Sequence, residues 1–141
     1  MNLHHVIISL AANRCQKPNL AKARQCLSDV LADVVYTAEL WTEPVNSPRT
    51  DLYLNQLCAA TTTLPLSELN QWLKQVELRF GRTAGRRQQG IVPIDLDVLL
   101  YDGQQYHLTD WHRPYVLTLI GQLPDTPLPI PLPTPEHQKS C

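Results

Sequence analysis

Two aspartates separated by a single residue are the clearest candidates for chemistry in this sequence. Asp95 and Asp97 stand in the segment Ile94-Asp95-Leu96-Asp97-Val98, where apolar and acidic residues alternate. Successive side chains of a strand point to opposite faces, so this pattern puts both carboxylates on one face of a predicted strand. Two adjacent anions repel each other unless a cation joins them, and Mg²⁺ is typically held by one or two carboxylates together with substrate phosphates. The spacing therefore favours a magnesium site.

Positive charge precedes this strand. Arg82 follows Gly81, and Arg86 and Arg87 come four and five residues later. Together with the aspartates, these arginines predict a site for a Mg-nucleotide on one face of a sheet. The alternative is a solvated strand face whose acidic residues discourage pairing with another edge strand. The basic segment favours the nucleotide site.

The composition limits the class of protein. A chain of 141 residues with a net charge of −1 is expected to form one domain, and it lacks the basic excess usual in nucleic-acid-binding proteins. Cysteines at positions 15, 26, 58 and 141 form no Cys-x-x-Cys pair, so a structural zinc site and a redox motif are not indicated. The apolar run 6–12 lacks a basic leader and is too short to span a membrane. We therefore expect a cytoplasmic protein that binds neither nucleic acid nor membrane.

The hydrophobic pattern predicts the elements that must position these residues. Helices are expected over 20–32, with Asn19 as the N-cap, and over 65–80, with Gly81 at the end. Strands are expected over 6–10, 34–42, 52–61 and 95–101, with a loop over 43–50. The order strand, helix, strand, strand, helix, strand predicts an α+β fold with helices packed on one face of an antiparallel sheet. The other face is then left for binding.

The end of the chain has a different composition. From residue 124 onward, prolines alternate with small or apolar residues, a pattern that favours an extended, polyproline-like conformation. We therefore expect a domain over 1–123 and a Pro-rich tail over 124–141. The tail could dock across the domain, remain flexible or serve as a Pro-rich ligand.

Five motifs stand out along the chain: Thr42-Glu43-Pro44-Val45, Leu54-Asn55, Val76-Glu77-x-x-x-Gly81-Arg82, the segment from Ile94 to Tyr101, and Arg113-x-Tyr115-Val116-Leu117. Together they resemble the 6-hydroxymethyl-7,8-dihydropterin pyrophosphokinase family, whose members transfer pyrophosphate from ATP to a pterin alcohol in folate biosynthesis. The resemblance covers roughly residues 5–125 and includes the spacing between the motifs. It implies a ferredoxin-like α+β fold with ATP as co-substrate and Mg²⁺ as cofactor, and we expect a monomer.

The resemblance also implies roles for individual residues. Asp95 and Asp97 would hold Mg²⁺ between the ATP phosphates and the pterin hydroxymethyl oxygen, and Arg82 and Arg113 would clamp phosphate oxygens. Contacts with ATP are expected from Glu77, Arg82, Arg86, Arg87 and Arg113. Contacts with the pterin are expected from Thr42, Pro44, Val45, Tyr53, Asn55 and Tyr115.

Some of these residues have a purely structural alternative. Glu77 could pair with arginines along its helix instead of touching ATP, and Asn55 could satisfy a backbone group at the end of a strand. Tyr53 could belong to ordinary sheet packing.

The sequence also departs from the family pattern, and the departures lie on the ATP side. Leu10-Ala11-Ala12-Asn13 stands where the family usually has Leu-Gly-Ser-Asn, and Gln89-Gly90-Ile91-Val92-Pro93 lacks the tryptophan and arginine of the usual Trp-Gly-Pro-Arg. His112 adjoins Arg113 but is not equated with the family's histidine. Three hypotheses therefore remain: an active enzyme, a catalytically weak paralogue that binds a nucleotide or pterin, and an interaction module with a vestigial site. The Asp pair favours the first two.

Overall fold

One antiparallel sheet organises the computed structural model of the protein, which describes residues 2–45, 47 and 49–123. Within these residues the sheet has six strands in the order β2-β4-β1-β5-β6, and β3 also pairs with β4. The predicted α+β fold is confirmed. The strands are β1 (His4–Ala12), β2 (Ala32–Tyr36), β3 (Leu40–Thr42), β4 (Tyr53–Thr62), β5 (Asp95–Tyr101) and β6 (Gln104–Gln105).

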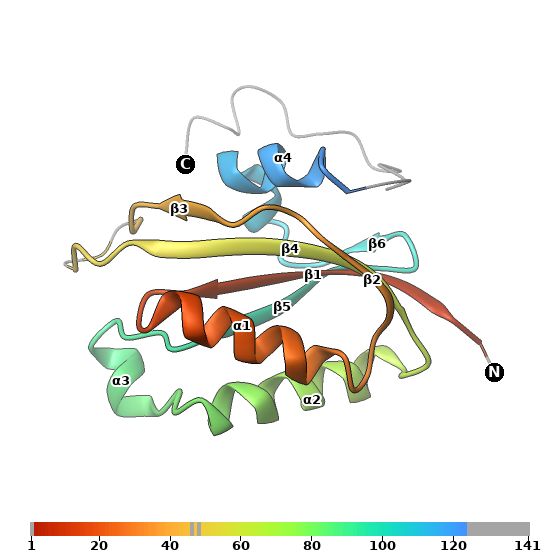
Figure 1. The fold of residues 1–141 in the computed structure, drawn as a ribbon, viewed down its shortest axis with the longest axis horizontal. Coiled ribbons are helices and arrows are strands. Elements are labelled where there is room, and N and C mark those ends of the chain that lie inside the picture. Colours follow the sequence, from red (N-terminus) through yellow and green to blue (C-terminus); the bar gives the residue numbers. More distant parts are fainter. Residues whose placement is uncertain (1, 46, 48, 124–141) are drawn as a thin grey trace.

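Helices lie on both faces of this sheet (Figure 1). The two long helices, α1 (Gln16–Leu27) and α2 (Leu66–Arg79), cover one face, and the short α3 (Ala84–Gln88) follows α2. A 3₁₀ turn, η1 (Asp110–His112), and helix α4 (Pro114–Ile120) lie on the opposite face. The sequence predicted helices on one face alone, so α4 is an addition that partly covers the expected binding face.

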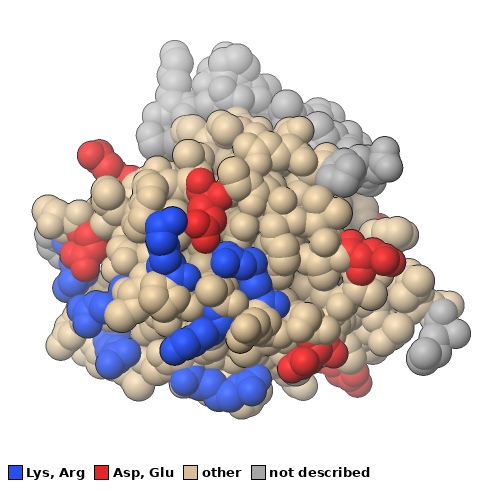
Figure 2. Space-filling view, viewed as in Figure 1, with Lys and Arg blue, Asp and Glu red and all other residues tan. Residues whose placement is uncertain are grey.

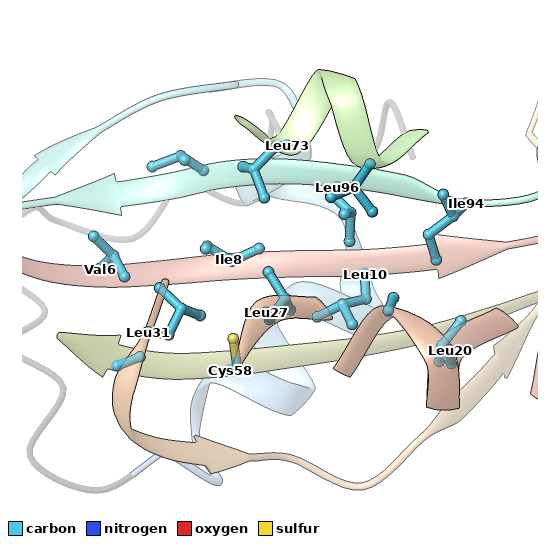
Figure 3. Close-up of a cluster of buried hydrophobic side chains, with 14 of the residues drawn as sticks. Val6, Ile8, Leu10, Leu20, Leu27, Leu31, Cys58, Leu73, Ile94 and Leu96 are labelled. Atoms are coloured by element: carbon cyan, nitrogen blue, oxygen red, sulfur yellow. The ribbon is translucent and has the colours of Figure 1, made fainter. Parts of the chain in front are cut away.

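The larger hydrophobic core fills the space between the sheet and the two long helices. Apolar residues two apart on β1 point into it, as the period of a strand requires, and they meet the apolar stripe of each helix. Figure 3 shows Ile8 and Leu10 of β1 near Leu27 of α1, and Leu73 of α2 near Leu96 of β5. All five side chains are 3% exposed or less. This core fixes which side chains β5 can present to the other face.

A second, smaller core lies beneath α4. Alternate residues of the same strands, Ile7 and Leu57 among them, meet Trp111 of η1 and Val116 and Leu119 of α4. The indole nitrogen of Trp111 donates hydrogen bonds to two backbone carbonyls, at 3.1 Å each. These contacts hold the segment 110–120 against the sheet at a fixed position.

Helix α1 begins and ends earlier than the sequence predicted. It runs from Gln16 to Leu27, with Cys15 at the N-cap, so the predicted cap Asn19 lies inside the first turns. Pro18 is tolerated there because the first N–H groups of a helix have no partner within the helix. The Asn19 amide instead donates to the carbonyl oxygens of Arg14 and Pro93, at 2.9 Å each. It thus joins the start of α1 to the segment that leads into β5.

The strand predicted over 34–42 is interrupted. The structure has β2 and β3 on either side of residues 37–39. Thr37 causes the break, because its hydroxyl accepts the Leu57 N–H at 3.0 Å while its own N–H donates to the Leu57 carbonyl. A side chain thus replaces a backbone partner for one residue. The Pro-rich segment 124–141 lies outside the described residues, so the predicted tail is not tested.

Candidate active site

An open pocket of about 200 Å³ lies at the end of the sheet where β5 begins, on the face that carries α4. Residues from β1, β3, β4 and β5 form its floor, and residues from η1 and the start of α4 form a wall. Eight of the predicted site residues therefore meet in one place. The lining residues are Ser9, Ala11, Thr42, Glu43, Val45, Tyr53, Asn55, Asp95, Asp97, Asp110, Arg113 and Tyr115.

The two aspartates share a face of β5, as their spacing predicted. Ile94, Leu96 and Val98 are buried in the larger core, so Asp95 and Asp97 point to the pocket side. Their side chains are 34% and 22% exposed. The apolar alternation thus holds two carboxylates side by side in the floor of the pocket.

Arg82 and Glu77 lie behind this pair. Nη1 of Arg82 contacts the Asp95 carboxylate at 2.6 Å and the Glu77 carboxylate at 3.1 Å. Glu77 is 5% exposed, and its Oε2 accepts the Leu96 N–H at 2.9 Å. This geometry favours the structural alternative for Glu77, and a contact of either residue with ATP stays a prediction.

Asp97 carries unbalanced negative charge. Burial, followed by repulsion from Asp95, raises the pKa of its carboxyl to about 7, while nearby His107 acts in the opposite direction. Burial also raises the pKa of Glu77, against the effects of the Leu96 N–H and Arg82. A divalent cation placed between these oxygens would relieve the repulsion.

Two groups of side chains in the described residues could hold such a cation. Ligand atoms of Glu77, Asp95 and Asp97 all lie within 4.8 Å of one another, and the same holds for Asp97, His107 and Asp110. The first group offers only carboxylate oxygens, the ligands that Mg²⁺ prefers. The second includes an imidazole nitrogen, which suits transition metals better. The first group therefore fits magnesium.

The part of the lining formed by Tyr53, Asn55 and Tyr115, called here the aromatic and amide wall, suits a flat, polar ring. Asn55 is 2% exposed, and its amide nitrogen donates to the Thr42 hydroxyl at 2.8 Å and to the Leu40 carbonyl at 3.0 Å. These bonds occupy both N–H groups of the amide and leave its oxygen without a hydrogen-bond partner among the described residues. Tyr53 and Tyr115 add aromatic surface beside it. Asn55 and Tyr53 share the face opposite α1 and α2, as strand parity predicted.

The remaining basic residues are distributed unequally. Arg113 lines the pocket, whereas Arg86 and Arg87 are exposed on α3 outside the lining. Figure 2 shows Lys and Arg side chains gathered over the part of the surface formed by α1 and α3. Pro44 is half-buried in the loop beside the pocket but is not among the lining residues.

Sequence reasoning missed three polar residues near the aspartates. Ser9 of β1 pairs with Asp97, and His107 approaches Asp97 at 3.6 Å, with Asp110 nearby. The sequence does contain a signal for His107 and Asp110, which is the dipeptide Asp102-Gly103. Such a dipeptide favours a tight hairpin turn, and both residues have the positive φ that this turn requires. That turn folds the following segment back along β5.

Comparisons with known proteins agree with this geometry. The family described as "7,8-dihydro-6-hydroxymethylpterin-pyrophosphokinase (HPPK)" matches residues 7–139. A protein of Arabidopsis thaliana, "Folate synthesis bifunctional protein", is 31% identical over 129 residues, which cover 84% of this chain and 26% of that protein. The chain thus spans about a quarter of the length of this relative. In the described residues no helix is both long and apolar enough to cross a membrane. With the family matched over nearly its whole length, the chain belongs to the 7,8-dihydro-6-hydroxymethylpterin pyrophosphokinase family.

Proposed function

We propose that this chain transfers pyrophosphate from ATP to the hydroxymethyl oxygen of 6-hydroxymethyl-7,8-dihydropterin, with Mg²⁺ bound by Asp95 and Asp97. The observation that carries the proposal is that this carboxylate pair and the aromatic and amide wall line the same pocket. A carboxylate pair alone would suit many metal sites, and the wall alone many flat ligands. Their combination suits a reaction between a metal-bound polyphosphate and a flat heterocycle.

The wall would orient the pterin. Its flat ring would lie against Tyr53 and Tyr115, and its amide-like edge would donate to the oxygen of Asn55. The hydrogen bond from Asn55 to Thr42 fixes that oxygen before the substrate arrives. Because the acceptor is preorganised, a pterin that binds it would have its hydroxymethyl oxygen aligned for the reaction.

The charged residues would align the nucleotide. Asp95 and Asp97 would hold Mg²⁺, which supplies neutralisation of phosphate charge when it is bound. Arg82 holds Asp95 in place through its 2.6 Å contact, and Arg113 presents a guanidinium to the pocket for phosphate oxygens. The pterin oxygen then attacks the β-phosphorus, the bond from that phosphorus to the α-phosphate oxygen breaks, and AMP leaves.

The direct test is AMP formation from ATP that depends on the pterin. We expect Asp95→Ala and Asp97→Ala to reduce the rate at least ~100-fold, the scale for losing a preorganised electrostatic contact. Glu68→Ala removes an exposed carboxylate from the first turn of α2, outside the pocket lining, and serves as the control. Parent activity in a chelator, or in either site variant, would show that the pair does not hold a required metal.

A catalytically weak paralogue that binds a nucleotide or pterin is the second candidate. The lining of the pocket includes four acidic residues and one arginine, and Ala11 and Val92 stand where the family usually has glycine and arginine. These features disfavour a polyphosphate more than a pterin. Calorimetry with Mg²⁺ and an ATP analogue that has a methylene between the α and β phosphates separates the candidates. Binding of both ligands without AMP formation would favour the paralogue. The monomeric state and the cytoplasmic location remain predictions.

A further inference from the structure

Asp110 and Arg113 form an ion pair on the rim of the pocket. Nε of Arg113 donates to Oδ1 of Asp110 at 3.1 Å, and the Arg113 N–H donates to the Asp110 carbonyl at 3.0 Å. Both residues line the pocket, and their side chains are 28% and 30% exposed. Neither the reaction as proposed nor the resemblance to the family gives Asp110 a role.

The pair uses only one side of the guanidinium. Among the described residues, the Asp110 carboxylate is the one hydrogen-bond partner of the Arg113 side chain, and the bond goes to Nε. The two terminal nitrogens therefore keep their donors for a ligand. Two parallel N–H groups match two oxygens of a phosphate, so the remaining side of the fork has the geometry of an anion clamp.

The backbone around the pair is fixed independently of it. Trp111, which lies between the two residues in sequence, is 3% exposed and is held by its two indole hydrogen bonds. Pro114 begins α4 directly after Arg113. The Asp110 carboxylate thus stands on a fixed base, and the long side chain of Arg113 is the mobile partner that it can restrain.

We propose that Asp110 is a positioning residue that holds Arg113 with its terminal nitrogens directed at the phosphate oxygens of the bound nucleotide. This inference rests on the proposed function. It opposes the simplest electrostatic expectation, which is that a carboxylate beside a phosphate site only weakens binding by repulsion. The restraint on Arg113 outweighs that repulsion.

Four variants test the inference: Asp110→Ala, Asp110→Asn, Arg113→Ala and the double variant Asp110→Ala/Arg113→Ala. Binding of inorganic pyrophosphate and of the methylene ATP analogue, each with Mg²⁺, is measured by calorimetry. We expect Asp110→Ala to weaken both about 10-fold, the loss typical of one charge-assisted hydrogen bond. Asp110→Asn should bind like the parent or more tightly, because its amide oxygen still accepts from Nε while the negative charge is gone.

The double variant shows whether Asp110 acts through Arg113. If it does, Asp110→Ala causes no further loss once Arg113 has been removed, because coupled residues are not additive. Additive losses would overturn the inference. So would parent-like binding by Asp110→Ala, tighter binding by Asp110→Ala, or an Asp110→Asn variant as weak as Asp110→Ala.

Controls separate this role from folding and from the reaction itself. Asp110→Ala should keep the parent's pterin affinity and melting temperature within the range of the Glu68→Ala control. Equal losses of pterin and pyrophosphate binding would indicate a structural role and overturn the inference. Because pyrophosphate binding needs no turnover, a protein that forms no AMP but shows the expected pattern refutes only the proposed reaction. Normal turnover with no effect of Asp110→Ala refutes only the positioning role.

Discussion

Asp97 titrates near neutral pH because burial and the adjacent Asp95 raise the pKa of its carboxyl to about 7. An unfolded chain would have an ordinary aspartate pKa of about 4. Between these two values the folded protein binds more protons than the unfolded chain does. The free energy of unfolding must therefore fall as pH rises through this window, in a protein without bound metal.

We predict that chelator-treated protein loses stability as pH rises from about 4 to about 7, by on the order of 2–4 kcal/mol. Asp97→Asn should remove most of this pH dependence, since its amide does not titrate. Urea unfolding at a series of pH values measures the effect, and saturating Mg²⁺ should flatten the profile of the parent. A profile in Asp97→Asn that matches the parent would assign the pH dependence to other groups.

Val92 occupies the position at which the resemblance places an arginine near the nucleotide. Its backbone is held independently of its side chain: Asn13 Oδ1 accepts the Val92 N–H at 2.6 Å, and the Asn13 N–H donates to the Val92 carbonyl at 2.9 Å. Both of these bonds use backbone atoms of Val92, so an arginine at this position would keep them.

We predict that Val92→Arg tightens binding of the Mg-ATP analogue or raises turnover by about 10-fold, the scale of one added charge-assisted contact. Pterin affinity should stay within about twofold of the parent value, since no pterin-side residue changes. Calorimetry with each ligand measures both. No gain, with a parent turnover normal for the family, would mean that Arg86, Arg87 or Arg113 already supplies the charge.

At the scale of elements, strand β5 lies at the edge of the sheet in the region that carries Asp95 and Asp97, although the site requires these two side chains to be held in place. Strand β6 pairs with Leu100 and Tyr101 only, so within the described part of the chain no strand covers the outer edge near Leu96. Glu77 of α2 supplies an acceptor for the Leu96 N–H and also contacts Arg82. A buried carboxylate thus ties the long helix to the strand that carries both aspartates.

We predict that Glu77→Ala lowers the free energy of unfolding by about 1–3 kcal/mol, because it leaves a buried N–H without a partner. Glu77→Gln should cost less, since its amide oxygen can accept the same bond. Glu68→Ala, at an exposed position of the same helix, is the control for helix propensity. Urea unfolding measures all three, and equal losses in Glu77→Ala and Glu77→Gln would contradict the proposed bond.

The same elements show how far the sequence alone reaches. Strand parity placed Asp95 with Asp97, and Tyr53 with Asn55, because a period of two needs no tertiary information. The break at Thr37 was missed because the hydroxyl competes with the backbone for the Leu57 N–H, a choice that only the neighbouring strand reveals.

Tertiary contacts also explain two other differences between the predicted and the observed structure. The start of α1 was predicted too late because Asn19 is a good N-cap by type, yet its amide bonds across to the Pro93 carbonyl. Asp110 and His107 reach Asp97 only through the return of the chain at Asp102-Gly103. The short-range pattern of the sequence therefore predicts the residues in the floor of the pocket. The residues on its rim are brought there by long-range packing, which that pattern does not contain.

At the scale of the whole molecule, the two cores on opposite faces of the sheet serve different purposes. The larger core joins α1 and α2 to the sheet, and the smaller one holds the segment 110–120, which carries Arg113 and Tyr115 into the pocket. Loss of packing in either core should reduce stability. Only loss in the smaller core should also displace a wall of the site.

Leu27 of the larger core and Leu119 of the smaller core provide a matched comparison, since they are 0% and 1% exposed. We predict that Leu27→Ala and Leu119→Ala each lower the free energy of unfolding by about 2–5 kcal/mol, the usual range for a buried Leu→Ala change. Ligand affinity is then measured at a temperature where both variants remain folded. Leu119→Ala should bind the pterin and the ATP analogue several-fold more weakly, because α4 can shift over the cavity and move Arg113 and Tyr115. Leu27→Ala should bind both like the parent, since α1 contributes no residue to the lining. Equal affinities in the two variants would show that the sheet floor alone holds the site, and that the α4 layer contributes stability without positioning.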